Sequence, residues 1–267
     1  MNNKDYHADV SRISKSGLDL IAKSPLHYWS KYLDPNREPE SPTPALIVGS
    51  AFHSIVLEPD KFNEEFAVAP NVDRRFSVGK QLWSDFTELN AGKTVLTTDQ
   101  YDTIRRMRDA VMAQPAVEKL LSAGRAEHTI HWDDDDTRVG CKARPDFLSS
   151  TGIVLDLKST EDATHDSFAR SCLNYRYHVQ AAFYLDGLNT SGNPAFDTFV
   201  FVAVEKSAPY AVSVFVAPTD FVELGRETYR SDLNKYKRAY ETGIWQGYPK
   251  EIQTIQLPAY AFKKEQL

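Results

Sequence analysis

The spacing of apolar residues changes along the chain, and its first part carries a helical spacing. Apolar residues recur at helical intervals over 18–32, with Ser14 or Ser16 placed to cap the first turn. Pro25 lies inside this pattern and divides it into two short helices. Residues 45–58 are apolar nearly all round and rich in small side chains, which predicts a buried helix. Further helices are predicted at 97–113, 115–122, 167–188 and 219–242.

The middle of the chain switches to short apolar runs separated by turn residues, a pattern typical of strands. Three strands are predicted between residues 126 and 158, with a solvated acidic turn at 133–136. Two more are predicted at 197–206 and 209–217. This order predicts an α/β fold with a central mixed β-sheet flanked by helices. We expect a single domain over 1–267, with a helical N-terminal elaboration (about 1–125), a sheet core (about 126–217), and a C-terminal helix and tail.

Composition and charge narrow the possible functions. The chain has 267 residues, 42% of them hydrophobic, so it can bury a sizeable core. A formal net charge of −6 excludes nucleic-acid coating by a globally basic surface, so any DNA-binding surface must be local. Cys141 and Cys172 have no metal-binding spacing and are expected to be free thiols. Without a signal peptide or a long apolar run, we expect a cytoplasmic protein with no membrane partner.

Two aspartates and a lysine lie near the ends of two neighbouring predicted strands. The second and third of these strands, at 139–147 and 152–158, would pair, which brings Asp146 and Asp156 toward one point. Two converging carboxylates repel each other and lose hydration, and a divalent cation removes both costs. We therefore predict a metal site at these two residues, with the backbone carbonyl of Leu157 as a further oxygen ligand. Lys158 projects from the same face as Asp156, so its ammonium can hold or deprotonate an attacking water, or stabilise developing charge.

Two helical pairs add polar groups to otherwise apolar faces. Gly49 and His53 share one face of the predicted helix at 45–58, where the small glycine allows a close neighbour and the imidazole projects. Gln180 and Tyr184 have the same spacing on the predicted helix at 167–188. Each pair alone is more typical of an ordinary hydrophobic core. The pairs become informative because of the order in which they and the two aspartate motifs follow one another along the chain.

In that order, the motifs G-x-x-x-H, P-D, D-x-K and Q-x-x-x-Y resemble the PDDEXK nuclease superfamily, in its RecB-like branch. The acidic residue of the triplet, which is often Glu there, is Asp156 here. The segments ISKSGLDLIAKSPLHYWSKYL and D-R-R-x-x-x-G-K are more specifically similar to the RecE family, the exodeoxyribonuclease VIII nuclease domain of prophages and phages. The resemblance runs from about Ser14 to the last strands and implies a restriction-endonuclease-like core.

The resemblance also implies an activity and its components. It implies a Mg²⁺-dependent exonuclease that degrades linear double-stranded DNA from its ends, 5′→3′, and leaves 3′ single strands for recombination by strand annealing. It implies His53, Asp146 and Asp156 as metal ligands and Lys158 as the catalytic lysine. Two metal ions about 3.5–4 Å apart would stabilise the attacking and the leaving oxygen of the hydrolysis, and Mn²⁺ should substitute for Mg²⁺. A homo-oligomeric ring, with a tetramer favoured, and a single-strand annealing protein are the implied partners.

Further residues are candidates for DNA contact or for the metal shell. Arg74, Arg75 and Lys80 form the sharpest basic cluster and suit phosphate binding at a 5′ end. Gln180 and Tyr184 would orient Lys158 or contact the strand near the scissile phosphate. A further candidate acid is Glu127, on the first predicted strand.

Two other interpretations compete with a recombination exonuclease. One is a catalytically silent DNA-binding or assembly module of the same fold, against which the intact set of His53, Asp146, Asp156 and Lys158 argues. The other is a Cas4-like repair nuclease, which here would lack an iron–sulfur cluster because the chain has no cysteine cluster.

Overall fold

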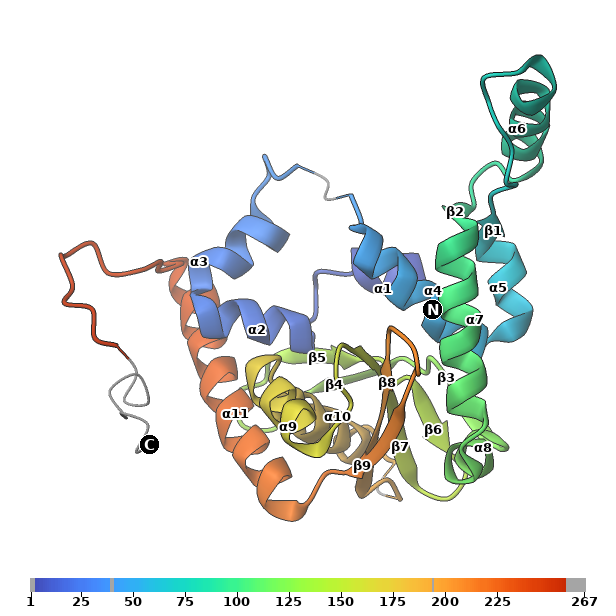
Figure 1. Ribbon diagram of the computed structural model, residues 1–267. Coiled ribbons are helices and arrows are strands. Elements are labelled where there is room, and N and C mark those ends of the chain that lie inside the picture. Colours follow the sequence, from blue (N-terminus) through green and yellow to red (C-terminus); the bar gives the residue numbers. More distant parts are fainter. Residues whose placement is uncertain (1–2, 39–40, 194, 258–267) are drawn as a thin grey trace, which may run out of the picture.

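Helices make up most of the first half of the chain, as its apolar spacing predicts (Figure 1). The structure is a computed structural model that describes residues 3–38, 41–193 and 195–257. The Ser14 hydroxyl accepts a hydrogen bond from the Gly17 N–H at 3.3 Å, and Pro25 begins a new helix, so the predicted cap and break are confirmed. These helices are α1 (Asn3–Ala8), α2 (Lys15–Lys23), α3 (Pro25–Tyr28), η1 (Trp29–Leu33), α4 (Pro44–Leu57), α5 (Pro59–Glu65), α6 (Ser77–Leu89), α7 (Thr98–Met112) and α8 (Pro115–Leu121).

A five-stranded mixed sheet, in the order β3-β6-β7-β8-β9, lies at the centre. The pair β7–β8 is parallel, and the other three neighbouring pairs are antiparallel. The predicted fold class, a mixed sheet flanked by helices, is therefore confirmed. Two small sheets, β1–β2 and β4–β5, flank the main one. The strands are β1 (Phe66–Val68), β2 (Thr94–Leu96), β3 (Gly124–Ala126), β4 (Ile130–Asp133), β5 (Gly140–Ala143), β6 (Phe147–Ser149), β7 (Ile153–Thr160), β8 (Thr198–Glu205) and β9 (Val212–Val216).

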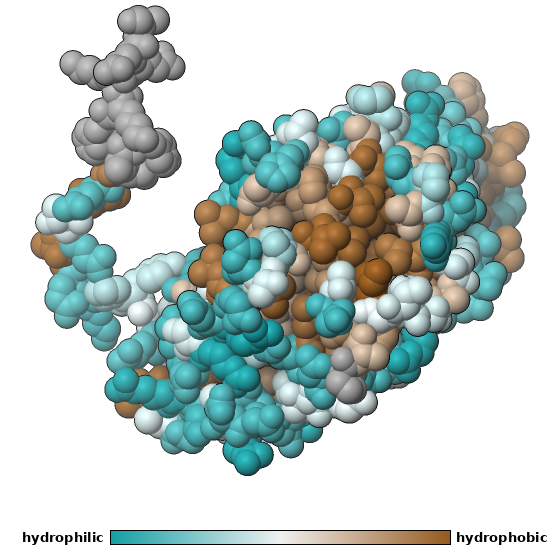
Figure 2. Space-filling model, turned by 90° about the horizontal axis from the view of Figure 1, so that it is seen from below, coloured by the Kyte–Doolittle hydropathy of each residue, from teal (hydrophilic) through white to brown (hydrophobic). Residues whose placement is uncertain are grey.

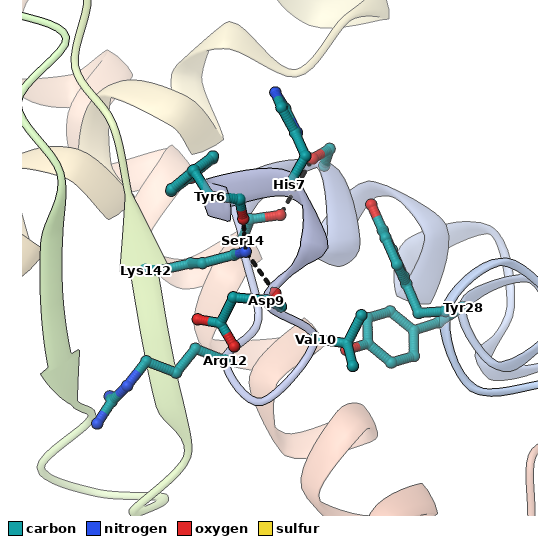
Figure 3. Close-up of a pocket in the computed structure, with 10 residues that line it drawn as sticks. Tyr6, His7, Asp9, Val10, Arg12, Ser14, Tyr28 and Lys142 are labelled. Atoms are coloured by element: carbon teal, nitrogen blue, oxygen red, sulfur yellow. Dashed lines mark hydrogen bonds between the residues drawn. The ribbon is translucent and has the colours of Figure 1, made fainter. Parts of the chain in front are cut away.

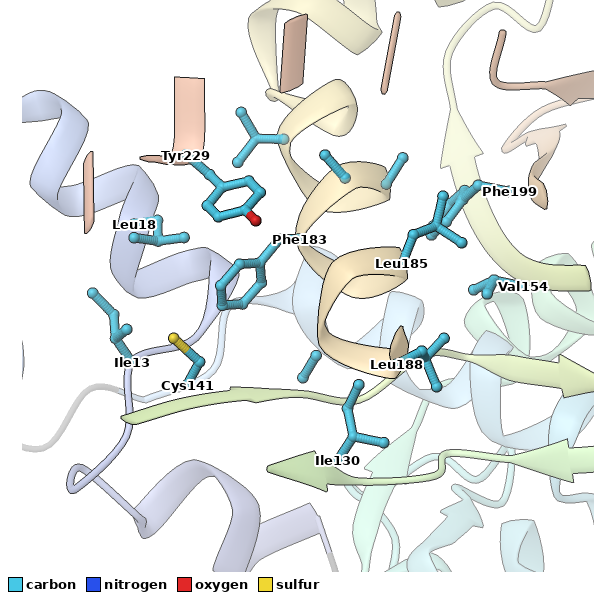
Figure 4. Close-up of a cluster of buried hydrophobic side chains, with 14 of the residues drawn as sticks. Ile13, Leu18, Ile130, Cys141, Val154, Phe183, Leu185, Leu188, Phe199 and Tyr229 are labelled. Atoms are coloured by element: carbon cyan, nitrogen blue, oxygen red, sulfur yellow. The ribbon is translucent and has the colours of Figure 1, made fainter. Parts of the chain in front are cut away.

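Each face of the sheet supports its own hydrophobic core, and β7 contributes to both. Val154 packs with Phe183 and Leu188 of α10 (Tyr177–Thr190) in one core, where Figure 4 shows side chains of α10 between the sheet and α2. Leu155 and Leu157 point to the opposite core, which contains residues of α4 and α7. Because side chains alternate along a strand, Asp156 and Lys158 share the α10 side with Val154.

The predicted helix at 167–188 is wrong as a single element. The structure has α9 (His165–Asn174) and α10, separated by a turn in which Arg176 has a left-handed backbone with a φ of 57°. The Arg176 guanidinium forms ion pairs with Asp232 and, at 3.6 Å, with Asp19. These partners from distant parts of the chain, of which Asp232 is buried, hold the turn without a local glycine or proline.

The predicted strand at 139–147 also divides in two. Its first part, β5, pairs with β4 in a separate hairpin, and its last part, β6, joins the central sheet. In the hairpin turn the Asp134 side chain is buried, accepts hydrogen bonds from Thr137, and pairs with Arg230 at 2.6 Å. The acidic turn is therefore present, but Asp134 is not solvated as we expected.

The C-terminal helix follows its pattern closely. α11 (Thr219–Thr242) has the predicted bounds and stops before Gly243, whose φ of 68° is a conformation that glycine adopts readily. Beyond it, the Trp245 ring stacks on Tyr28 with ring centroids 5.8 Å apart. The end of the expected tail, 258–267, lies outside the described residues.

The helix predicted at 45–58 is present as α4, but it is only partly buried, so the prediction of burial is wrong. In α4, Ala51 and Phe52 are buried, but the side chain of Leu46 is 64% exposed. Apart from the neighbouring residues and backbone of its own helix, no described atom would lie within 4 Å of a Cβ at Gly49, so the close neighbour expected there is absent. The apolar surface of α4 is therefore larger than the part that the described residues of this chain cover.

Apolar side chains are also exposed elsewhere. α6 stands apart from the central sheet, beyond β1 and β2 (Figure 1), and Phe76, Val78 and Leu89 in or next to it are exposed. Figure 2 shows a further group of apolar side chains on the face of the molecule seen from below. Over the described ranges, no helix is both long enough and apolar enough to cross a membrane.

Candidate metal centre

Asp146 and Asp156 do meet where β6 lies beside β7. Phe147 is paired with Leu155, so Asp146, one residue before β6, lies beside Asp156. The Leu157 N–H donates a hydrogen bond to Asp146 Oδ2 at 2.7 Å. Because the N–H and C=O of one strand residue point the same way, the Leu157 carbonyl also faces this carboxylate, as the predicted ligand role requires.

His53 and Glu127 complete a cluster around Asp146. His53 projects from α4, and its Nδ1 lies 3.4 Å from Asp146 Oδ2. Glu127 follows β3 with a left-handed backbone, at a φ of 47°, and its N–H donates to the Asp146 carbonyl at 2.9 Å. One ligand atom from each of the three side chains lies within 4.8 Å of the other two. Sequence reasoning treated Glu127 as a secondary candidate, and the structure places it in the centre.

Asp156 is engaged differently from the other predicted ligands. Its side chain is 1% exposed, contacts the Lys158 ammonium, and accepts a hydrogen bond from Gln180 Nε2. It is not a member of the three-residue cluster of His53, Glu127 and Asp146. Direct coordination of a metal by Asp156 therefore stays a prediction, whereas the structure shows its contact with Lys158.

Lys158 is held as a cation. Burial lowers the pKa of its ammonium, but the charges of Asp156 and Asp146 outweigh burial and raise that pKa above its usual value. The ammonium also lies 4.7 Å from the ring centroid of Tyr177, a residue that the sequence analysis did not select. Without a bound metal, this environment favours the two roles that need a charged ammonium, which are holding water and stabilising charge.

The cluster balances its charges with protons. Burial lowers the pKa of His53, but Asp146 raises it overall to about 9. Burial and the Asp146 charge raise the pKa of Glu127 to about 8. Burial alone would raise the pKa of Asp146, but His53 and Lys158 hold it below its usual range. At neutral pH without a cation, His53 and Glu127 thus carry protons that a bound metal would displace.

Gln180 and Tyr184 lie on the same stretch of α10, as their spacing predicts. Gln180 fixes the Asp156 carboxylate and so acts on Lys158 through it. The Tyr184 ring packs against Phe199, with ring centroids 6.2 Å apart. Burial raises the pKa of its phenol well above the usual value, and the charges of Asp156 and Asp146 add to this, so Tyr184 is a neutral group.

The N-terminal helix α1 closes against β5 near this centre. The Lys142 ammonium reaches the carbonyls of Tyr6 and Asp9, as Figure 3 shows. The Arg144 guanidinium lies 4.6 Å from the ring centroid of Tyr6. Sequence reasoning missed this arrangement, because α1 has only six residues and a polar composition.

The structure does not bring the predicted basic cluster to the metal centre. Arg74 and Arg75 lie just before α6, and Lys80 lies within it, on the part that stands apart from the sheet in Figure 1. The Arg75 Nε donates to Asp73 Oδ1 at 3.0 Å, and the Arg74 guanidinium lies 4.5 Å from the Trp83 ring centroid. A DNA contact by these residues would be made away from the cluster.

Comparisons with known proteins agree with this architecture. The crystal structure of a "Putative exonuclease" from Eubacterium rectale is similar, with a TM-score of 0.68 and 14% identity, over 97% of this chain and 95% of that chain. A phage related exonuclease from Haemophilus somnus 129PT gives a TM-score of 0.36 and 10% identity, over 73% of this chain and 94% of that one, and a TM-score this low does not indicate a shared fold. No curated protein matches the sequence.

A family match decides the relationship. The profile of the PDDEXK-like domain of unknown function, DUF3799, matches residues 14–258, which include all four motifs noted in the sequence. The first structural likeness shows the same fold. The chain therefore belongs to the DUF3799 family of PDDEXK-like domains.

Proposed function

We propose that this protein is a divalent-metal-dependent exonuclease of the RecE type, which degrades linear double-stranded DNA 5′→3′ and leaves 3′ single strands for recombination by annealing. The observation that carries the proposal is the cluster of His53, Glu127 and Asp146 next to the buried ammonium of Lys158. Membership of a PDDEXK-like family and a fold shared with a protein named as an exonuclease support it.

The donor set fits a divalent cation of the magnesium and manganese kind. Glu127 and Asp146 offer carboxylate oxygens, which Mg²⁺ and Mn²⁺ prefer, and His53 adds one imidazole nitrogen, which Mn²⁺ accepts more readily than Mg²⁺. The Leu157 carbonyl and Asp156 would complete the shells if a second ion binds. When bound, the cation supplies Lewis-acid polarisation of the scissile phosphate.

The remaining groups act on charge and orientation. The Lys158 ammonium stands where it can hold the attacking water or stabilise negative charge that develops on the phosphate. Asp156 positions that ammonium, and Gln180 in turn fixes Asp156. The Lys158 ammonium lies over the Tyr177 ring, 4.7 Å from the ring centroid, which favours its charged form.

The proposal extends to DNA contacts and partners. Arg74, Arg75 and Lys80 would contact phosphates of the duplex away from the cutting centre, and Tyr184 would lie next to the strand being cut. A homo-oligomeric ring and a single-strand annealing partner follow from the resemblance to the RecE family, and the half-exposed apolar α4 supports self-association. Light scattering of the purified protein, which gives the mass of the assembly, tests the ring.

A digestion experiment tests the activity. We expect the purified protein to degrade a linear blunt duplex in the presence of Mg²⁺ or Mn²⁺, and to leave it whole with a chelator present. A covalently closed circle of the same sequence should survive, because an exonuclease needs an end. An intact linear duplex under all metal conditions would favour the catalytically silent module, and a cut circle would indicate an endonuclease.

The protonated ligands give a pH dependence of metal binding. His53 and Glu127 have pKa values of about 9 and about 8 in the protein without metal, and both must lose protons to bind a cation. The Mn²⁺ affinity should therefore rise steadily between about pH 6 and about pH 8, with proton release measurable by calorimetry in buffers of different ionisation enthalpy. The Glu127→Gln variant should release fewer protons. An affinity independent of pH would contradict this assignment of protons.

A further inference from the structure

A pocket of about 330 Å³ opens next to Lys158, beyond the carboxyl end of β7. Thr160, two residues after Lys158 on the same face of the strand, lines it. Tyr177 belongs to both places, since it lines the pocket and also contacts the Lys158 ammonium. Through Tyr177 the pocket therefore adjoins the Lys158 side of the proposed metal centre, on the sheet end where α/β folds bind ligands.

One wall of the pocket presents aromatic rings. The rings of Tyr175 and Tyr177 are stacked with an interplanar angle of 26° and centroids 5.7 Å apart. Tyr175 is 62% exposed, although it lies at the sharp turn between α9 and α10 that Arg176 holds. A large ring kept in solvent by a rigid turn leaves a flat apolar surface free for another ring.

The rest of the wall is mostly polar, and Lys206 is the only cation among the described residues that line it. The hydroxyls of Ser167 and Ser171 from α9 line it, together with the Asp162 carboxylate. The ammonium of Lys206 is paired with Glu161 at 2.9 Å. Carboxylates would repel a phosphate, whereas hydroxyls and carboxylates can pair with the polar edge of a neutral base.

We propose that this pocket binds one unstacked nucleobase of the strand being cut, next to the scissile phosphate. The base stacks on Tyr175, and its polar edge meets the hydroxyl and carboxylate wall. The inference rests on the proposed nuclease function, because the position of Lys158 defines which base enters. It adds that the end of the duplex must open locally before hydrolysis, because a paired base cannot stack in a pocket of this kind.

Fluorescence of 2-aminopurine tests binding without any hydrolysis. The base is placed in turn at each of the first positions of a single-stranded oligonucleotide, and the protein is added with a chelator present. Stacking should quench the fluorescence at one position in the wild type and in Tyr175→Phe, and Tyr175→Ala should abolish that quenching. Tyr240→Ala is the matched control, because Tyr240 on α11 is 65% exposed and should leave quenching intact. Equal quenching in wild type and Tyr175→Ala overturns the proposal.

A cleavage experiment tests the same contact by removing Tyr175 and the base, first separately and then together. With normal duplex, Tyr175→Ala should lower the rate roughly tenfold, the size expected from a lost base stack. With an abasic residue at the quenched position, the wild type should lose the same factor and Tyr175→Ala should lose nothing more. Losses that multiply would show that Tyr175 and the base act separately. If no variant cuts any substrate, the proposed function fails, and the fluorescence result alone decides the base-binding site.

Discussion

The Lys158→Ala variant should hydrolyse linear duplex about 10²- to 10³-fold more slowly than the wild type, because it lacks the cation that stabilises developing charge on the phosphate. The ammonium is the group that contacts Asp156, and no other lysine or arginine among the described residues contacts that carboxylate. The loss should appear in the rate at saturating DNA, measured under single-turnover conditions, and much less in DNA affinity.

The control for this variant separates chemistry from stability. Removing Lys158 leaves the buried Asp156 without its cation, a change that costs roughly 3–5 kcal/mol for a charged group and less if the carboxyl takes up a proton. Lys142→Met also removes a nearly buried ammonium, the one bound to the carbonyls of Tyr6 and Asp9. It should lower the melting temperature but reduce the rate per folded molecule far less. A Lys158→Ala protein that is folded and cuts at the wild-type rate would remove Lys158 from the mechanism.

The second large effect concerns the metal. Asp146→Asn should weaken Mn²⁺ binding by at least about 100-fold, because the ligand that carries the negative charge becomes a neutral amide. The pKa of His53 should fall as well, since burial lowers it and the opposing Asp146 charge is gone. Titration calorimetry with Mn²⁺ measures the first effect, and NMR titration of the imidazole measures the second.

A buried aspartate elsewhere provides the matched control. Asp134 is also buried, accepts hydrogen bonds from Thr137 and pairs with Arg230, but it lies in the β4–β5 turn. Asp134→Asn should destabilise the protein and leave Mn²⁺ binding unchanged. If Asp134→Asn and Asp146→Asn weakened Mn²⁺ binding equally, the effect would belong to general unfolding and not to a ligand.

The part of the site that lies on strands could be predicted from the sequence. Side chains alternate along a strand, so Asp156 and Lys158 had to share a face, and a short turn had to bring Asp146 beside them. Gln180 and Tyr184 were likewise placed together by the helical repeat. Local periodicity decides these relations, and the break at Arg176 did not disturb them because it falls before both residues.

The remaining features depend on contacts between distant segments, which periodicity does not contain. Glu127 enters the metal cluster because a left-handed backbone and a hydrogen bond to Asp146 turn the chain after β3. Arg176 ends a helix whose sequence shows no break, because Asp232 and Asp19 pair with it. The apolar composition of α4 predicted burial, but composition does not say whether the covering surface lies in the same chain.

The most direct test of the account is the position of a bound metal. Crystals grown with Mn²⁺ and measured at a wavelength where manganese scatters anomalously should show a strong peak between the side chains of His53, Glu127 and Asp146, with the Lys158 ammonium facing it. A peak at another place, with those three side chains paired only with each other at saturating Mn²⁺, would contradict the central claim.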